Sequence, residues 1–258
     1  TSVFSKRGVA TKVPKWDGSK CIQCNRCSMC CPHAAIRPVL LTEEEKKSVP
    51  AGFETVPAKG LGKDSPYSFR MQVSPYDCLG CGVCLTACPA EGALTMTSFE
   101  DMKPEQTLFD EVAMNESYLK KDVINDKSVK NVQFAKPYFQ FSAACAGCAE
   151  TSYARLITQL FGEKMFISNA TGCSSIWGGT ASISPYTTNK ASGHGPAWIN
   201  SLFEDNAEHG LGMQIGYETV RANLITKVEA LKGKNAELDA VIDKFLETKN
   251  NTKANDEP

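Results

Sequence analysis

Twelve cysteines, nine of them gathered in two short runs, constrain the fold of this 258-residue chain more than any other feature. Both runs follow the spacing C-x2-C-x2-C-x3-C-P. The first run comprises Cys21, Cys24, Cys27 and Cys31, and the second comprises Cys78, Cys81, Cys84 and Cys88. Because the same spacing occurs twice, the chain carries an internal repeat, which indicates a duplicated unit organised around its cysteines.

Disulfide bonds and zinc fit these runs less well than iron-sulfur clusters do. Disulfide frameworks are typical of secreted domains shorter than about 80 residues, and cysteines three apart on a short loop are poorly placed to bridge one another. Zinc usually takes its four ligands as two separated pairs, whereas each run offers three closely spaced thiols and a fourth before a proline. The pattern favours iron-sulfur ligation in a reducing compartment.

The spacing predicts two [4Fe-4S] clusters that share their loops crosswise. Three thiolates on one tight loop can reach three corners of a cubane, while the fourth, redirected by the proline, reaches the other cluster. We call the two groups the first and second cluster sites. The first consists of Cys21, Cys24, Cys27 and Cys88, and the second consists of Cys31, Cys78, Cys81 and Cys84.

Two residues near the first run have ambiguous roles. Cys30 adjoins Cys31 but lacks the following proline, so we expect it to be a small buried side chain rather than a ligand. His33 could tune a cluster through a hydrogen bond, although a histidine bonded to backbone or water is the simpler expectation.

The remaining three cysteines form a third group in the second half of the chain. Cys145-x2-Cys148 follows an apolar segment and precedes a helical pattern, a placement shared by thioredoxin-like dithiols and by cluster ligands. Cys173 lies in a Gly-rich segment that an α/β unit could bring back beside the start of that helix. Three thiols would then meet, and a fourth ligand would be water, another residue type or a residue outside this chain.

Composition divides the chain into three parts. Residues 1–20 are expected to be a polar lead-in linker. Residues 21–118 form the two-cluster domain, with an insertion at 37–77 that contains a charged turn or short helix at 43–47. Residues 119–258 read as part of an α/β domain.

Periodicity predicts specific elements. Residues 101–135 read as a linker with a short helix at 108–113. In the third part, the apolar positions from Tyr153 to Phe161 predict a helix, and residues 138–141 and 165–167 predict strands that pair in parallel. Residues 171–198 are expected to be loop, 211–231 a long helix, and Asn235 the cap of a last helix. Residues 248–258 are expected to be disordered.

Charge and hydropathy limit the partners that we expect. The 28 Lys and Arg residues against 29 Asp and Glu give a net charge of −1, which argues against nucleic acid and anionic membranes as partners. No stretch approaches the roughly 18 apolar residues of a membrane span. We therefore expect a cytoplasmic protein, with an anaerobic organelle as the alternative.

Several long runs resemble one enzyme family, the pyruvate:ferredoxin (flavodoxin) oxidoreductases. These runs are KCIQCNRCSMCCPHAAIRP, YDCLGCGVCLTACPAEGALTM, FSAACAGCAETSYARLITQLFG, ISNATGCSSIWGG and GPAWINSLFEDNAEHGLGM. The resemblance covers nearly the whole chain and implies an internal segment of a longer enzyme. The implied fold is an α+β ferredoxin-like domain with two [4Fe-4S] clusters, followed by the amino-terminal part of an α/β thiamine-diphosphate-binding domain.

The same resemblance implies roles for the third cysteine group. Cys145, Cys148 and Cys173 would hold a third [4Fe-4S] cluster whose fourth ligand lies outside this chain, and Glu150 and Cys173 would contact thiamine diphosphate bound with Mg²⁺. The family's Gly-Asp-Gly…Asn motif for that cofactor has no counterpart here. Catalysis is therefore incomplete in this chain.

The implied reaction converts pyruvate and coenzyme A to acetyl-CoA and carbon dioxide and reduces ferredoxin or flavodoxin. Other segments would bind pyruvate and coenzyme A, and the enzyme would be a homodimer. Two other functions remain open at this point. One is a freestanding two-cluster electron-transfer subunit, and the other is a dithiol oxidoreductase that uses Cys145 and Cys148 with ferredoxin as its reductant.

Overall fold

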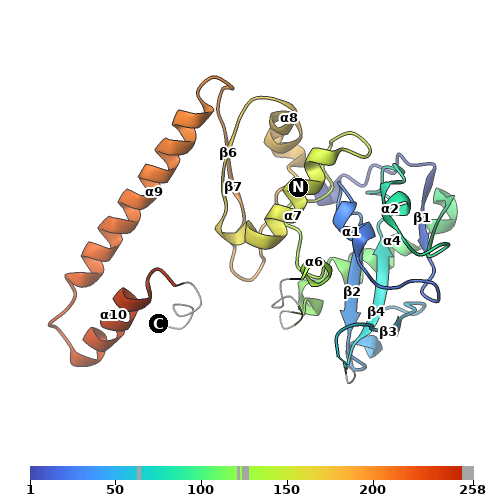
Figure 1. Cartoon of the computed structure of the whole chain (residues 1–258), viewed down its shortest axis with the longest axis horizontal. Coiled ribbons are helices and arrows are strands. Elements are labelled where there is room, and N and C mark those ends of the chain that lie inside the picture. The colour runs from blue at the N-terminus through green and yellow to red at the C-terminus, as the bar shows by residue number, and fades with distance from the viewer. Residues whose placement is uncertain (63–64, 121–122, 124–127, 252–258) are drawn as a thin grey trace. The chain divides into compact units, whose positions relative to one another are not determined.

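The computed structural model describes residues 1–62, 65–120, 123 and 128–251. The chain divides into two compact units, Thr1–Asn200 and Ser201–Pro258. Figure 1 shows the first unit as the mixed α and β part that carries all twelve cysteines, and the second as a pair of helices. The boundary that composition suggests near residue 118 stays a prediction.

The two cysteine runs lie between a pair of strands from opposite ends of the repeat. β1 (Lys12–Trp16) pairs antiparallel with β5 (Leu94–Ser98), with Trp16 opposite Leu94. The short helices α1 (Arg26–Cys30) and α2 (Val83–Ala87), which lie between β1 and β5 in the chain, contact each other. The lead-in expected to be a linker therefore contributes β1, and also the 3-10 turn η1 (Ser2–Phe4).

The sequence repeat is also a repeat of backbone geometry. Gln23 and Gly80 have φ values of 60° and 67°, and Asn25 and Gly82 have values of 59° and 75°. For residues that have a Cβ atom, this left-handed backbone conformation costs about 1 kcal/mol. Gln23 and Asn25 adopt it nevertheless, and hydrogen bonds of their side chains hold them in place. The Gln23 amide donates to the Pro57 carbonyl at 2.8 Å and accepts from the Lys59 N–H at 2.7 Å.

Both helices end in the same way, because a proline follows each terminal cysteine. Cys31 and Cys88 are extended, with ψ values of 114° and 117°. Proline disfavours the helical region for the preceding residue. The last cysteine of each run is thereby turned out of its own helix.

The insertion at 37–77 forms a sheet that supplies the apolar core. β2 (Ile36–Leu41), β4 (Ser68–Val73) and β3 (Val56–Pro57) pair antiparallel in the order β2-β4-β3. Leu40, Phe69 and Met71 are buried in one cluster with Cys27 and Cys84. The expected short helix at 43–47 is confirmed as the 3-10 turn η2 (Glu45–Lys47). The sheet therefore covers both cysteine loops.

Short helical turns connect the two-cluster part to the rest of the first unit. They are α3 (Phe99–Met102), α4 (Glu105–Leu108), the π-helical turn η3 (Phe109–Ala113), η4 (Glu116–Tyr118) and α6 (Val129–Val132). The helix expected at 108–113 is thus present as a continuation of α4. Phe109 and Val112 of η3 are buried.

The last part of the first unit only partly matches the predicted strand, helix and strand. The predicted helix and second strand are present as α7 (Ala149–Phe161) and β6 (Phe166–Asn169), with the turn η5 (Gly162–Lys164) between them. After β6 come α8 (Cys173–Gly179), η6 (Ala181–Ile183) and β7 (Ala197–Asn200). β6 pairs in parallel with β7, not with 138–141. The expected strand at 138–141 forms only an isolated bridge, Phe139 to Tyr186. α8 and β7 occupy part of the segment expected to be loop.

The burial of α7 is the reverse of what its apolar pattern suggests. Tyr153, Leu160 and Phe161 are exposed, and Tyr153 reaches 68% exposure. The buried residues of α7 are Thr151, Arg155 and Thr158. The polar face of this helix packs within the first unit, and its apolar face is left uncovered.

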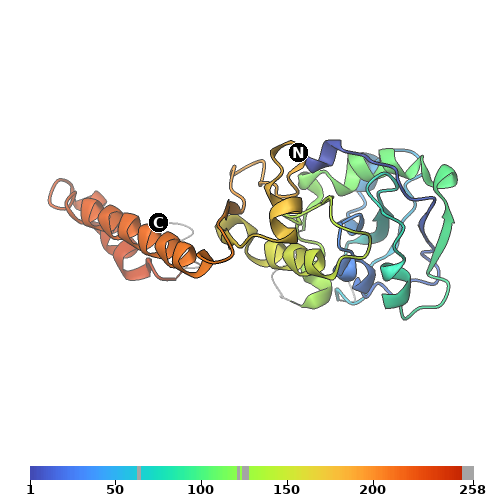
Figure 2. The ribbon, with the colours of Figure 1, turned by 90° about the horizontal axis from the view of Figure 1, so that it is seen from above.

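The second unit is an antiparallel pair of helices, α9 (Asn206–Glu229) and α10 (Ala236–Thr248), as Figures 1 and 2 show. Arg221 of α9 donates to the Lys249 carbonyl at 2.6 Å. The turn contains Gly233, with φ +85°, and Asn235 caps α10 by accepting from the Glu237 N–H at 2.9 Å, as expected. Beyond Asn251, the segment expected to be disordered lies outside the described residues. None of the helices that the structure describes could cross a bilayer.

Phe69 offers a test of the core around the cysteine loops. It is 1% exposed, and its ring meets those of Trp16 and Phe134 edge-on at centroid distances of 6.0 and 6.3 Å. Phe69→Ala should lower the free energy of unfolding by about 3–5 kcal/mol, because it leaves a cavity among three segments. Chemical unfolding of the anaerobically purified protein measures the change.

Phe4→Ala is the matched control, because Phe4 is 84% exposed. Its unfolding free energy should stay within about 0.5 kcal/mol of the unsubstituted protein. Equal effects of the two substitutions would contradict a core centred on Phe69.

Candidate metal centres

The four thiols predicted for the second cluster site line one small, mostly apolar cavity. Its walls include Cys31 from the first run and three cysteines of the second run, namely Cys78, Cys81 and Cys84. The remaining walls come from β1, the turn before β2, β4 and the loop into α2. The fold therefore brings the last cysteine of one run beside the first three of the other, which is the crosswise grouping that the spacing predicts.

Two of these thiols, Cys78 and Cys84, are shielded from water, which disfavours their charged form, whereas Cys81 is exposed. Burial, and then the neighbouring Cys31 and Cys78, raise the pKa of Cys84 well above its ordinary value. Burial is also the main cause that raises the pKa of Cys78 to about 12. Without iron the thiols of Cys78 and Cys84 keep their protons at neutral pH, and thiolate ligation to a multiply charged iron centre would release them.

The thiols of the first cluster site are gathered by the first loop and the end of α2. Cys27 is buried, and burial together with Cys84, Cys21 and Cys24 raises its pKa. Cys21 and Cys88 pack against the apolar cluster that contains Cys27. Among the described residues, no three His, Cys, Asp or Glu side chains lie close enough to hold a single metal ion.

Backbone N–H groups point at equivalent sulfurs in the two loops. The Gln23 N–H donates to Cys21 Sγ at 3.3 Å, and the Gly80 N–H donates to Cys78 Sγ at 3.4 Å. Hydrogen bonds of this kind stabilise a thiolate and are one of the ways in which proteins tune cluster potentials. Donor type, cavity and hydrogen bonding therefore all fit iron-sulfur cubanes.

Cys30 and His33 have surroundings that suit structural roles. The Cys30 thiol points at the carbonyls of Cys27 and Val83, at 3.5 and 3.8 Å, so it fills the space between α1 and α2. His33 is 2% exposed, and its Nδ1 lies 3.3 Å from the Ser142 hydroxyl. Burial lowers the pKa of His33 to about 4, so its ring is neutral at pH 7.

The third cysteine group begins on a turn that touches the second cluster loop. Gly147, between Cys145 and Cys148, has φ +76°, and a Cβ atom there would lie 3.6 Å from Cys81 Cβ and 3.5 Å from Val83 Cγ2. The Cys148 N–H closes the turn onto the Cys145 carbonyl at 3.1 Å. The two cysteine-bearing loops, far apart in sequence, thus lie so close that a side-chain carbon at position 147 would be in van der Waals contact with Cys81.

Two side chains of α7 fasten it to α1, beside which it lies in Figures 1 and 2. The Ser152 hydroxyl donates to the Cys30 carbonyl at 3.1 Å, and Arg155 Nη2 donates to the Met29 carbonyl at 2.6 Å. These carbonyls belong to the last turn of α1, directly before Cys31. Sequence reasoning missed both residues, because the helix was recognised by its apolar positions alone.

Cys148 packs against one apolar cluster, and Cys173 and Glu150 are each related to one residue of that cluster. Phe139, Ala144 and Trp177 form its buried part, and Cys148 and Tyr186 pack against it. Cys173 is the exposed first residue of α8, one turn before Trp177 on the same helix. Burial, and then the charge of Glu150, raise the pKa of Tyr186 above its ordinary value.

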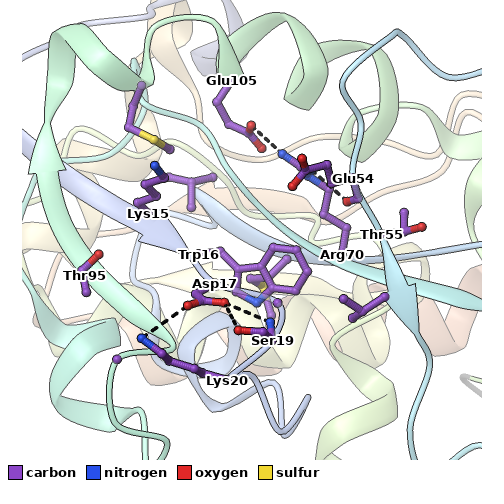
Figure 3. Close-up of a pocket in the computed structure, with 16 residues that line it drawn as sticks. Lys15, Trp16, Asp17, Ser19, Lys20, Glu54, Thr55, Arg70, Thr95 and Glu105 are labelled. Carbon is purple, nitrogen blue, oxygen red and sulfur yellow. Dashed lines mark hydrogen bonds and ion pairs between the residues drawn. The ribbon is translucent and has the colours of Figure 1, made fainter.

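A separate pocket of about 800 Å³ lies beside Trp16, between β1 and β4, and Figure 3 shows its walls. Four of its charged side chains form two ion pairs. Arg70 contacts Glu105 at 2.7 Å, and Asp17 contacts Lys20 at 3.4 Å. All sixteen lining residues are described and none is a cysteine. The pocket is therefore not part of the cysteine sites.

Comparison with known proteins agrees with the cysteine pattern. The family model of the 4Fe-4S dicluster domain matches residues 20–93. Pyruvate-flavodoxin oxidoreductase of Enterobacter agglomerans is 50% identical over 96% of this chain and 21% of its own length. Pyruvate:ferredoxin oxidoreductase of Moorella thermoacetica is 48% identical over 88% of this chain and 19% of its own length.

A third relative has a different electron acceptor in its name. Pyruvate dehydrogenase [NADP(+)] of Cryptosporidium parvum is 50% identical over 86% of this chain and 11% of its own length. The chain thus spans about one fifth or less of these relatives, and it matches an internal segment of much longer oxidoreductases that act on pyruvate. Residues 20–93 form a dicluster domain within that segment.

Cys30 and Cys31 offer a matched pair for testing the second cluster site. Cys31→Ser should remove about four irons, because only Cys31 lines the cavity with three cysteines of the second run. Cys30→Ser should keep the full iron content. Iron and acid-labile sulfide analysis of anaerobically purified proteins measures both, and loss of iron from the Cys30 variant alone would overturn the assignment.

Proposed function

We propose that this chain is the electron-relay segment of a 2-oxoacid oxidoreductase. The complete enzyme converts pyruvate and coenzyme A to acetyl-CoA and carbon dioxide and reduces ferredoxin or flavodoxin. One observation carries the proposal: the Cys145–Cys148 turn lies beside the second cluster loop, so close that a Cβ atom at Gly147 would lie 3.6 Å from Cys81 Cβ. A third redox centre on that turn would hand electrons directly to the dicluster domain.

The contacts suggest an order for the relay. Cys145, Cys148 and Cys173 hold the third cluster, with its fourth ligand outside this chain, and this centre receives electrons from the substrate. The second site, whose Cys81 lies beside Gly147, comes next. The first site follows, since Cys27 and Cys84 are buried in the same apolar cluster. Electrons leave from the first site to the acceptor protein.

Thiamine diphosphate with Mg²⁺ would supply the carbon chemistry, by stabilising negative charge on the carbon next to the cleaved bond. We assign Glu150 and Cys173 as the residues of this chain that contact thiamine diphosphate. Both lie around the apolar cluster of Phe139 and Trp177, and Cys173 is exposed at the start of α8. The residues after Cys148 would therefore contact thiamine diphosphate on one side and the third cluster on the other.

The uncovered apolar surface of the first unit supports an origin in a larger protein. Ile157 and Phe161 of α7 are exposed, as are Phe166 and Ile199 of the parallel strands. Contiguous apolar surfaces of this kind mark interfaces. We assign this surface to the remainder of the thiamine-diphosphate domain, and pyruvate and coenzyme A to other segments. A cytoplasmic homodimer is the form in which we propose that the enzyme works.

Cys148→Ala in the complete natural polypeptide tests the relay. The variant should lose pyruvate-dependent dye reduction, because the third centre can no longer form, while dithionite still reduces the two clusters of the dicluster domain. Its iron content should fall from about twelve to about eight. Iron analysis and anaerobic activity assays measure these changes, and Cys30→Ser, which should keep both, is the control.

The 258-residue chain alone provides the converse test. It should keep about eight irons and should not oxidise pyruvate. Pyruvate oxidation by this chain without any further polypeptide, or full activity of the Cys148→Ala enzyme, would contradict the proposed function. Full iron content in Cys148→Ala would contradict the third cluster.

A further inference from the structure

Arg155 is a buried cation that binds the last turn of α1, directly before Cys31. The side chain is 1% exposed although it lies in the middle of α7. Its Nη2 donates to the Met29 carbonyl and its Nη1 to the Gln159 side-chain oxygen, both at 2.6 Å. Its Nε has no hydrogen-bond partner among the residues that the structure describes. Every bonded partner is therefore a neutral group.

The charge of Arg155 is nevertheless felt at the second cluster site. Burial lowers the pKa of Arg155 to about 10, and Cys31 and then Cys30 act in the opposite direction as negative neighbours. An arginine with that pKa remains charged at pH 7. The hydrogen bond from Arg155 Nη2 to the Met29 carbonyl places the guanidinium two residues before Cys31, the thiol that the first run contributes to the second site.

Arg37 is a second buried arginine, but its negative neighbours include carboxylates. Asp77 is the strongest of them, ahead of Cys31 and Asp110, and the nearby charge of Arg155 acts on Arg37 in the opposite direction. Asp77 and Asp110 also flank Lys6, each at 2.8 Å from Lys6 Nζ. Arg155 forms no ion pair within the described part of the chain. Burying an unbalanced charge is costly, so Arg155 requires a balancing anion that the side chains in the described part of the chain do not supply.

A cubane bound by four thiolates is such an anion, because the thiolates and sulfides outweigh the iron charges, and one more negative charge is added on reduction. In a low-dielectric interior a nearby cation favours the more negative, reduced state. The net charge around a cluster is one of the factors that set its potential. Arg155 would be balanced by the second cluster and would in turn favour its reduction.

We propose that Arg155 tunes the relay by holding the reduction potential of the second cluster above that of the first. The inference rests on the proposed function, since it requires the clusters that the two sites would hold. It makes the second cluster the one that is reduced first, next to the turn of the third cysteine group. The docking contact of α7 then serves also as the electrostatic control of the first electron transfer.

The first cluster site lacks an equivalent within the described residues that surround it. Lys59 donates to the Cys21 carbonyl at 3.3 Å, and Arg26 is the first residue of α1, but both side chains are exposed. Water screens exposed charges strongly. An exposed positive charge beside the first site should therefore shift the potential of the first cluster less than buried Arg155 shifts the potential of the second cluster.

Anaerobic redox titration followed by electron paramagnetic resonance tests the proposal in the complete natural polypeptide. Arg155→Met should shift the potential of the second cluster to more negative values and leave the first unchanged, and Arg155→Lys should restore most of the shift. The Cys31→Ser protein identifies the signal of the second cluster by its loss. Arg26→Met, which removes an exposed positive charge beside the first run, should shift neither cluster.

Ser152→Ala separates charge from docking. It removes the other hydrogen bond between α7 and α1, to the Cys30 carbonyl, and leaves the charge of Arg155 in place. Its second cluster should titrate as in the unsubstituted protein. An equal shift in Ser152→Ala and Arg155→Met would overturn the proposal, as would an unchanged second cluster in Arg155→Met.

The order of the two potentials gives a test that does not depend on the folding of any Arg155 variant. In the unsubstituted protein the signal that Cys31→Ser removes should appear first during reduction. Its appearance after that of the first cluster would overturn the tuning proposal. Absence of two cubanes from the iron and sulfide analysis would instead contradict the proposed function, so the two failures are distinguishable.

Discussion

The crowding of cysteine thiols between α1 and α2 is the constraint on which the rest of the fold depends. Cys27 and Cys84 are buried in the same apolar cluster as Phe69, and burial raises the pKa of both thiols. These thiols are costly to ionise unless a positive centre compensates them. The β2-β4-β3 sheet, the left-handed turns and the prolines all serve to bring them together around such centres.

The docking of α7 extends this centre into the second half of the first unit. Ser152 and Arg155 bind the last carbonyls of α1, and Gly147 packs on Cys81. Because α7 buries its polar face within the first unit, its apolar face is exposed and available to contact another surface. α7 is thus placed between the dicluster domain and the surface that we assign to the remainder of the enzyme.

The sequence predicts the chemistry of the chain better than its packing. Spacing and prolines are local signals, so they identify both cysteine runs and the extended residues Cys31 and Cys88. The helical spacing from Tyr153 to Phe161 and the cap Asn235 are also local signals, and both positions agree with the structure, although α7 begins four residues earlier, at Ala149. The failures are non-local. β6 pairs with β7, 31 residues further along, and Phe139 meets only Tyr186. The role of Arg155 depends on a contact with α1, which no periodicity within α7 can predict.

Magnetic coupling between the two clusters tests the central claim most directly, namely that two thiol-rich loops exchange their last cysteines. Cubanes that share ligand loops in this way lie close together, so the fully reduced dicluster domain should give one spin-coupled electron paramagnetic resonance spectrum. Two magnetically isolated signals, each unaffected by reduction of the other cluster, would contradict the crosswise arrangement of Cys31 and Cys88.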